Sequence, residues 1–240
     1  MDDNSAHPDG ERISARALVM ACGAWLLGRI LVYVLLGVCP CFGTVPELTL
    51  LVGLFPLFLA LLTAMLFWRP LARRVGWRTL LGLEEPPEST IRRWLWPLVC
   101  SLPLVLVGGG LTLCVLKLGS LCHLPEPPPQ FPFLAEGEVT PSYLLTLFVL
   151  SVGIGPLVEE ILFRALAMRA FAETHTRHPV VLSALLFALM HLLPQGIPTL
   201  TVVGLVCAWR FRRGGLWSAC ALHAMYNFWI FLWFLFCLWH

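Results

Sequence analysis

Long runs of apolar residues, separated by short polar connections, make up most of this chain. A helix needs roughly 20 apolar residues to cross the hydrocarbon core of a bilayer, and six runs have about that length or more. The fifth run is interrupted at Pro194-Gln195-Gly196, so we divide it into two short spans and predict seven transmembrane helices. The runs lie at about residues 17 to 39, 46 to 68, 94 to 118, 142 to 158, 179 to 209 and 216 to 239.

The composition supports a membrane protein rather than a soluble one. Of the 240 residues, 58% are hydrophobic and 12% are charged, which is too apolar for a soluble domain. The first run is longer than the apolar part of a secretory signal, and no small-x-small cleavage site follows it, so we expect it to be retained. The predicted fold class is all-α: a polytopic membrane helix bundle of about seven transmembrane helices.

Positive charge is confined to alternate connections. Of the 16 Lys and Arg residues, 14 lie before the first predicted span or after the second, fourth and sixth. The positive-inside rule therefore predicts a cytoplasmic N-terminus and, after seven crossings, a C-terminus on the far side. This alternation also supports the division of the fifth run. The 14 residues are Arg12, Arg16, Arg69, Arg73, Arg74, Arg78, Arg92, Arg93, Arg164, Arg169, Arg177, Arg210, Arg212 and Arg213.

The chain divides into three parts on composition. Residues 1–11 are polar and predicted to be disordered, residues 12–140 hold the first transmembrane helices and their loops, and residues 141–240 hold the polar groups considered below. The nine cysteines show no pattern of a zinc finger. Most lie in spans and are expected to pack as small hydrophobes. A disulfide from Cys39 or Cys41 to Cys122 is an open prediction, because this topology puts all three on the non-cytoplasmic side.

Ionisable groups at membrane depth are costly, and each is a candidate functional residue. At 1.5 Å per residue, Glu159, His191 and Asn227 lie roughly 18 Å from the cytoplasmic ends of their helices, and His223 lies about 12 Å in. Four polar groups from three helices are therefore predicted to meet in one layer of the bilayer.

Helical spacing separates the two adjacent glutamates. Glu160 and Arg164 are four residues apart with the acid first, which is the favourable order for an ion pair, whereas Glu159 has Phe163 at that position. We predict that Glu160 is structural and that Glu159 faces a cavity as a general base. The upstream Gly153-Ile154-Gly155-Pro156 is expected to break the helix and admit water beside Glu159.

Each of these features has an ordinary explanation when it is taken alone. The Glu-Glu-x-x-x-Arg segment is typical of an ion-paired helix face. A lone His in an apolar helix is usually a packing residue. The pair His223 and Asn227 is typical of polar contacts that join two membrane helices. Together they offer a base, a second polar group to activate water, and donors for an oxyanion. No Ser or Cys has the context of an activated nucleophile, so the pattern favours hydrolysis by direct attack of water.

At these residues the chain resembles the CPBP family of intramembrane proteases, which includes the type 2 CAAX prenyl endopeptidases and bacteriocin-processing or immunity proteins. The resemblance covers roughly residues 145 to 230 and makes residues 141–240 the catalytic core. It implies a glutamate-type endopeptidase in which Glu159 and His191 activate water and His223 and Asn227 stabilise the oxyanion. Glu160, Arg164 and Phe187 would support them. It implies no metal or other cofactor. The motifs are Glu159, Glu160 and Arg164; Phe187 and His191; and His223 and Asn227.

Three other functions stay open at this point. Glu159, His191 and His223 could present ligands to zinc, although no H-E-x-x-H pair is present. Relatives linked to bacteriocin immunity suggest a non-catalytic binding protein, and a proton-coupled transporter is a weaker possibility because no inverted repeat is apparent. For the protease, we expect a membrane-associated or lipid-modified peptide substrate, the lipid bilayer and no nucleic acid as partners, and a location in the bacterial cell membrane.

Overall fold

A computed structural model describes residues 13–38, 46–84, 88–123 and 139–239. All regular secondary structure in these residues is helical, and five helices are long and apolar enough to cross a membrane. The predicted class, an all-α membrane helix bundle, is confirmed. The five candidate spans are Ile13–Leu35, Leu50–Val75, Thr90–Leu121, Pro141–Glu173 and Pro194–Trp239.

The fourth span is one continuous helical path that contains two π-helical segments. Six-residue and seven-residue π-helical segments, η3 and η4, interrupt the α-helix on either side of a short α6. The other helices are regular except for the last. The elements are α1 (Ile13–Val38), α2 (Pro46–Val75), α3 (Trp77–Leu80), α4 (Thr90–Leu121), α5 (Pro141–Phe148), η3 (Val149–Ile154), α6 (Gly155–Glu160), η4 (Ile161–Ala167), α7 (Met168–Glu173), α8 (Pro179–Met190), the 3₁₀ turn η5 (Pro194–Gly196) and α9 (Ile197–Trp239).

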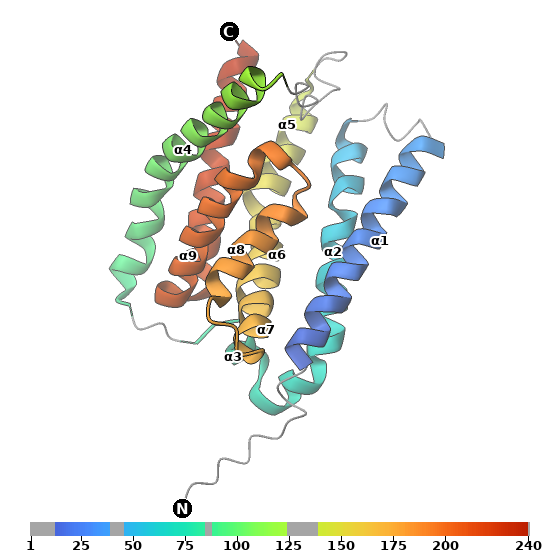
Figure 1. Ribbon diagram of the computed structural model, residues 1–240, viewed down its shortest axis with the longest axis vertical. Helices are drawn as coiled ribbons and strands as arrows, with labels where there is room; N and C mark the ends of the chain where they lie inside the picture. Colours follow the sequence, from blue (N-terminus) through green and yellow to red (C-terminus); the bar gives the residue numbers. More distant parts are fainter. Residues whose placement is uncertain (1–12, 39–45, 85–87, 124–138, 240) are drawn as a thin grey trace, which may run out of the picture.

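Figure 1 shows how these helices are arranged. The α1–α2 pair forms one side of the molecule, α4 and α9 form the other, and the path from α5 to α7 lies between them with α8. Large apolar side chains such as Ile30, Leu106 and Trp233 are exposed on the outside. An apolar exterior of this kind is expected of a surface that faces lipid.

Close helix packing depends on small residues at two contacts. A Cβ atom on Gly28 of α1 would lie 2.8 Å from Pro56 Cα of α2, and one on Gly204 of α9 would lie 3.0 Å from Ala184 Cα of α8. Small residues let helix backbones approach closely, which is how membrane helices gain van der Waals contact. The α8–α9 contact matters for the site, because each of these helices carries one of the candidate histidines.

The predicted division at Pro194-Gln195-Gly196 is present as the turn η5, which separates α8 from α9. Helix α8 has 12 residues, or roughly 18 Å, which is less than the hydrocarbon thickness of roughly 30 Å. A second break follows at Gly215, whose φ of 74° and ψ of −175° bend α9. The first part of α9 thus returns beside α8, and the second part runs to the far end of the bundle (Figure 1). The count of seven crossings and the side of the N-terminus stay predictions.

The segments rich in arginine meet at one end of the molecule. Ser14 Oγ donates to Glu173 Oε1 at 2.9 Å, linking α1 to α7. Arg169 Nη2 donates to the carbonyl of Thr79 at 3.4 Å, linking α7 to α3. Buried Arg210 forms an ion pair with Glu88 at 2.7 Å, which ties α9 to the segment just before α4. We call this the arginine-rich end. The predicted tail and the cysteines Cys39 and Cys41 lie outside the described residues, so the disulfide to Cys122 stays a prediction.

Candidate active site

The two glutamates lie at the end of α6, between the two π-helical segments. The winding of η3 depends on Gly155, whose backbone N–H bonds to the carbonyl of Leu150, five residues back. A Cβ atom on Gly155 would lie 2.8 Å from that carbonyl oxygen, so a residue with a side chain would not fit without a shift. The break predicted at Gly153-Ile154-Gly155-Pro156 is not present, because the helix continues through these residues and only its winding changes. Entry of water beside Glu159 stays a prediction. π-Helical turns occur frequently at functional sites.

Glu160 and Arg164 form the ion pair that their spacing predicted. Glu160 Oε2 lies 3.1 Å from Arg164 Nε, and both side chains are 0% exposed. Arg164 Nη1 also donates to Ser183 Oγ at 3.2 Å, and the guanidinium lies 5.1 Å from the ring centroid of Phe187. Burying either charge alone would be costly. The pair joins η4 to α8 and fixes the position of the Glu160 carboxylate.

His223 lies between the two glutamates. Its Nδ1 is 2.9 Å from Glu160 Oε1, and because an ionised carboxylate only accepts hydrogen bonds, Nδ1 carries the proton. The other ring nitrogen, Nε2, is 3.7 Å from Glu159 Oε2. The Glu159 side chain is 19% exposed, whereas that of Glu160 is 0% exposed. Glu160 thus orients the ring, and Nε2 faces the more accessible carboxylate.

His191 also packs against Phe187. Its Nδ1 donates to the backbone carbonyl of Phe187 at 2.8 Å, and the two ring centroids are 4.6 Å apart. The same Phe187 ring lies 5.6 Å from the His223 ring and meets it edge to face. Among the described residues no polar contact joins Glu159 to His191, so the structure places His223, rather than His191, next to Glu159.

Asn227 satisfies a carbonyl group that the π-helical segment leaves free. The Gly155 N–H is used by Leu150, and the residue five positions after Ser151 is Pro156, which has no N–H. The carbonyl of Ser151 therefore lacks its helical donors. Asn227 Nδ2 donates to it at 2.7 Å. The second hydrogen of this amide remains available for another acceptor.

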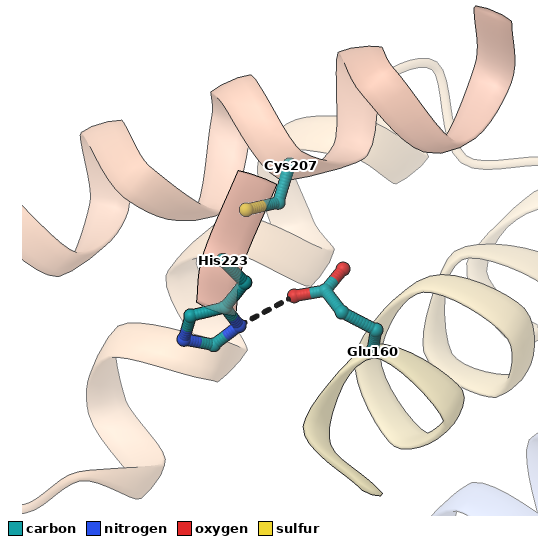
Figure 2. Close-up of side chains that lie close together, drawn as sticks. All are labelled: Glu160, Cys207 and His223. Atoms are coloured by element: carbon teal, nitrogen blue, oxygen red, sulfur yellow. Dashed lines mark hydrogen bonds and ion pairs between the residues drawn. The ribbon is translucent and has the colours of Figure 1, made fainter. Parts of the chain in front are cut away.

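One group of side chains in the described part of the chain has the spacing of a metal site. Glu160, Cys207 and His223 each offer a ligand atom, and these atoms lie within 4.8 Å of one another. Figure 2 shows Cys207 and His223 approaching from α9 and Glu160 from α6, with the hydrogen bond between His223 and Glu160. This is not the set of Glu159, His191 and His223 that the sequence left open as an alternative zinc site. The Arg164 cation already pairs with Glu160, so a second cation here would face electrostatic repulsion.

Sequence analysis missed two residues of this cluster. Cys207 was grouped with cysteines that pack as small hydrophobes, and no spacing motif marks it. Ser183 accepts from Arg164 and donates to the backbone carbonyl of Phe163, so it links η4 to α8. The sequence signal for Ser183 is weak: it is a small polar residue within an apolar helix. Its partner is only identified once both helices are placed.

Comparison with known protein families gives one match. Residues 141–229 match the family described as Type II CAAX prenyl endopeptidase Rce1-like. The matched segment includes every motif residue from Glu159 to Asn227, and the resemblance to the CPBP family of intramembrane proteases is confirmed. This family indicates a protease and supports an intramembrane endopeptidase of the CAAX type in general terms. No curated protein and no solved structure matches the chain.

Proposed function

We propose, from the match of residues 141–229 to the type II CAAX prenyl endopeptidase family, that this chain is a glutamate-type intramembrane endopeptidase. The observation that supports the mechanism is the position of one imidazole between two different carboxylates. His223 Nδ1 is held by buried Glu160 at 2.9 Å, and its Nε2 faces the more exposed Glu159 at 3.7 Å. One glutamate fixes the ring, and the other is free to act on water.

In this mechanism Glu159 takes a proton from water while the water oxygen attacks the carbonyl carbon of the peptide bond. His191 assists as the second group that polarises the water, because its Nδ1–H is bound to Phe187 and its Nε2 can accept a hydrogen bond. A general base placed in this way contributes roughly 10²–10⁴-fold to the rate.

The negative oxygen of the tetrahedral intermediate needs donors. Asn227 supplies the second hydrogen of its amide, since the first is used by Ser151. If His223 enters the reaction with a proton on both ring nitrogens and keeps both throughout, it supplies Nε2–H, with Glu160 keeping the ring in place. When the intermediate collapses, the C–N bond breaks, and the proton held by Glu159 passes to the leaving nitrogen. The products are a new carboxylate and a new amine.

The substrate is proposed to be a membrane-associated or lipid-modified peptide. The apolar exterior and the partly buried catalytic groups favour a substrate that reaches the site from within or beside the bilayer. The location proposed for the protein is the bacterial cell membrane. No metal ion takes part in this mechanism, because the carboxylate, the two imidazoles and the amide supply the base and the donors that it uses.

The test compares new protein termini in membranes from cells that carry the wild-type chain or the Glu159→Gln variant at equal abundance. The matched control is Glu84→Gln, the same chemical change at an exposed residue of the arginine-rich end. We expect a set of termini that is present with the wild type and the control and absent with Glu159→Gln. Identical termini in all three membranes would refute Glu159 as the base and favour a non-catalytic binding or immunity function.

A further inference from the structure

A cavity of about 910 Å³ opens at the arginine-rich end. Glu160 and His223, which bond to each other in the candidate active site, do not line it. Figure 1 shows the surrounding elements near the end of the molecule where α1 begins. They are α3, η4, α7, the start of α8 and the part of α9 before its bend. Its lining combines cationic and apolar side chains. They include Arg169, Arg177, Arg212, Leu80, Val180 and Phe211.

The positive charge of this lining exceeds its negative charge within the described residues. Arg169, Arg177 and Arg212 form no ion pair with a carboxylate there, and Arg169 donates only to the backbone carbonyl of Thr79. The lining also includes Glu173, whose carboxylate accepts a hydrogen bond from Ser14. Three arginines around one cavity create a potential that attracts an anion.

The start of α8 adds backbone donors to the same cavity. His178, at the N-cap position, makes no side-chain hydrogen bond that would cap the helix. The first N–H groups of an α-helix have no partner within the helix, and here they belong to Val180 and Val181, both of which line the cavity. The N-terminus of a 12-residue helix carries a partial positive charge that favours phosphate or carboxylate groups.

Arg164 also lines this cavity, but its charged group already has partners in the candidate active site. It pairs with Glu160, donates to Ser183 and is only 1% exposed. The contacts to an anion are therefore expected from Arg169, Arg177 and Arg212.

We propose that this cavity binds the phosphate headgroup of an anionic phospholipid. A phosphate group fits the arginines and the helix N-terminus, because guanidinium groups pair with phosphate through two parallel hydrogen bonds. The apolar part of the lining, which includes Leu80, Val181 and Phe211, suits the glycerol and the first acyl carbons rather than a free ion. The site is at the end of the membrane helices, where headgroups lie. The proposal does not depend on the proteolytic function.

The test measures lipid binding to the purified full-length protein in detergent by isothermal titration calorimetry. The probes are dihexanoylphosphatidylglycerol, dihexanoylphosphatidylcholine and inorganic phosphate. We expect saturable binding of the anionic lipid, at least tenfold tighter than the binding of the zwitterionic lipid or of inorganic phosphate. Equal binding of the two lipids would overturn the proposal, and so would inorganic phosphate binding as tightly as the anionic lipid.

A charge-matched pair of variants locates the binding. The cavity variant combines Arg169→Gln, Arg177→Gln and Arg212→Gln, and the control combines Arg73→Gln, Arg74→Gln and Arg213→Gln. The control arginines are exposed at the same end but do not line the cavity. We expect the cavity variant to bind the anionic lipid at least tenfold more weakly, while the control binds within threefold of the wild type. Equal weakening in both variants would show only general attraction to a basic surface and would refute the site. Thermal unfolding of each variant checks that it is folded.

Discussion

Replacing Glu160 with Gln tests whether the buried carboxylate has a second task besides pairing with Arg164. The change keeps the size of the side chain and leaves an amide oxygen that can accept from His223 Nδ1. It removes the negative charge that lies 3.1 Å from Arg164 Nε, in a place where both side chains are 0% exposed. Arg164 would keep Ser183 and the Phe187 ring as partners, and neither of them neutralises its charge.

The magnitude follows from this burial. Removing one partner of a buried ion pair costs about 3–5 kcal/mol of stability, because the other charge stays buried without compensation. Adding Arg164→Met to Glu160→Gln removes that second charge, and replacing a buried pair with neutral groups is often neutral or stabilising. We therefore expect the double variant to recover most of the lost stability.

Activity should respond differently from stability. In the double variant His223 still has an acceptor, but the carboxylate at 2.9 Å from Nδ1 that stabilises the ring in its protonated form is gone, and only Glu159, 3.7 Å from Nε2, remains. Cleavage of a substrate identified by the comparison of termini should therefore stay about 10²–10⁴-fold below the wild-type rate. Stability is measured by SDS titration in mixed micelles, and cleavage is measured with the same preparations.

Two results would refute this reasoning. A double variant that regains wild-type cleavage would show that Glu160 only neutralises Arg164 and does not act through His223. A single variant that loses less than about 1 kcal/mol would show that water reaches the pair, since exposed ion pairs contribute about that much or less.

Three further changes test the other parts of the site. Gly155→Ala should reduce cleavage by about 10–100-fold, because its Cβ would lie 2.8 Å from the Leu150 carbonyl and displace the glutamates; Gly153→Ala, which meets nothing within 4 Å, is the control and should leave cleavage unchanged. Gly204→Leu should cost about 1–3 kcal/mol in SDS titration by pushing α9 away from Ala184 of α8. Incubation with a metal chelator should leave the rate of cleavage unchanged, whereas a loss that zinc restores would favour the metal-dependent alternative.

The main features of the fold could be predicted because lipid imposes simple rules on sequence. Apolar runs locate the long helices, and the interruption at Pro194-Gln195-Gly196 appears as the turn between α8 and α9. The bend at Gly215 falls between the predicted sixth and seventh spans. Helix α8 shows the limit of such reasoning, because an apolar run gives the length of a helix but not its direction or its depth.

The candidate site could be predicted only in part. The spacing of Glu160 and Arg164 was sufficient to predict their pair, since helical neighbours are set by local geometry. Which histidine lies next to Glu159 depends on how α8 and α9 pack, and the sequence carries no simple signal for that. The hydrogen bond from Asn227 to Ser151 was also beyond prediction, because it requires the winding of η3 as well as the missing N–H of Pro156.

Adjacent helical residues point about 100° apart, so two neighbouring glutamates would ordinarily serve different surfaces. Here both reach one imidazole, because His223 presents Nδ1 to Glu160 and Nε2 to Glu159. The same Glu160 also pairs with Arg164, a residue that lines the cavity at the arginine-rich end. A chain of contacts therefore runs from that cavity through Arg164, Glu160 and His223 to the proposed base.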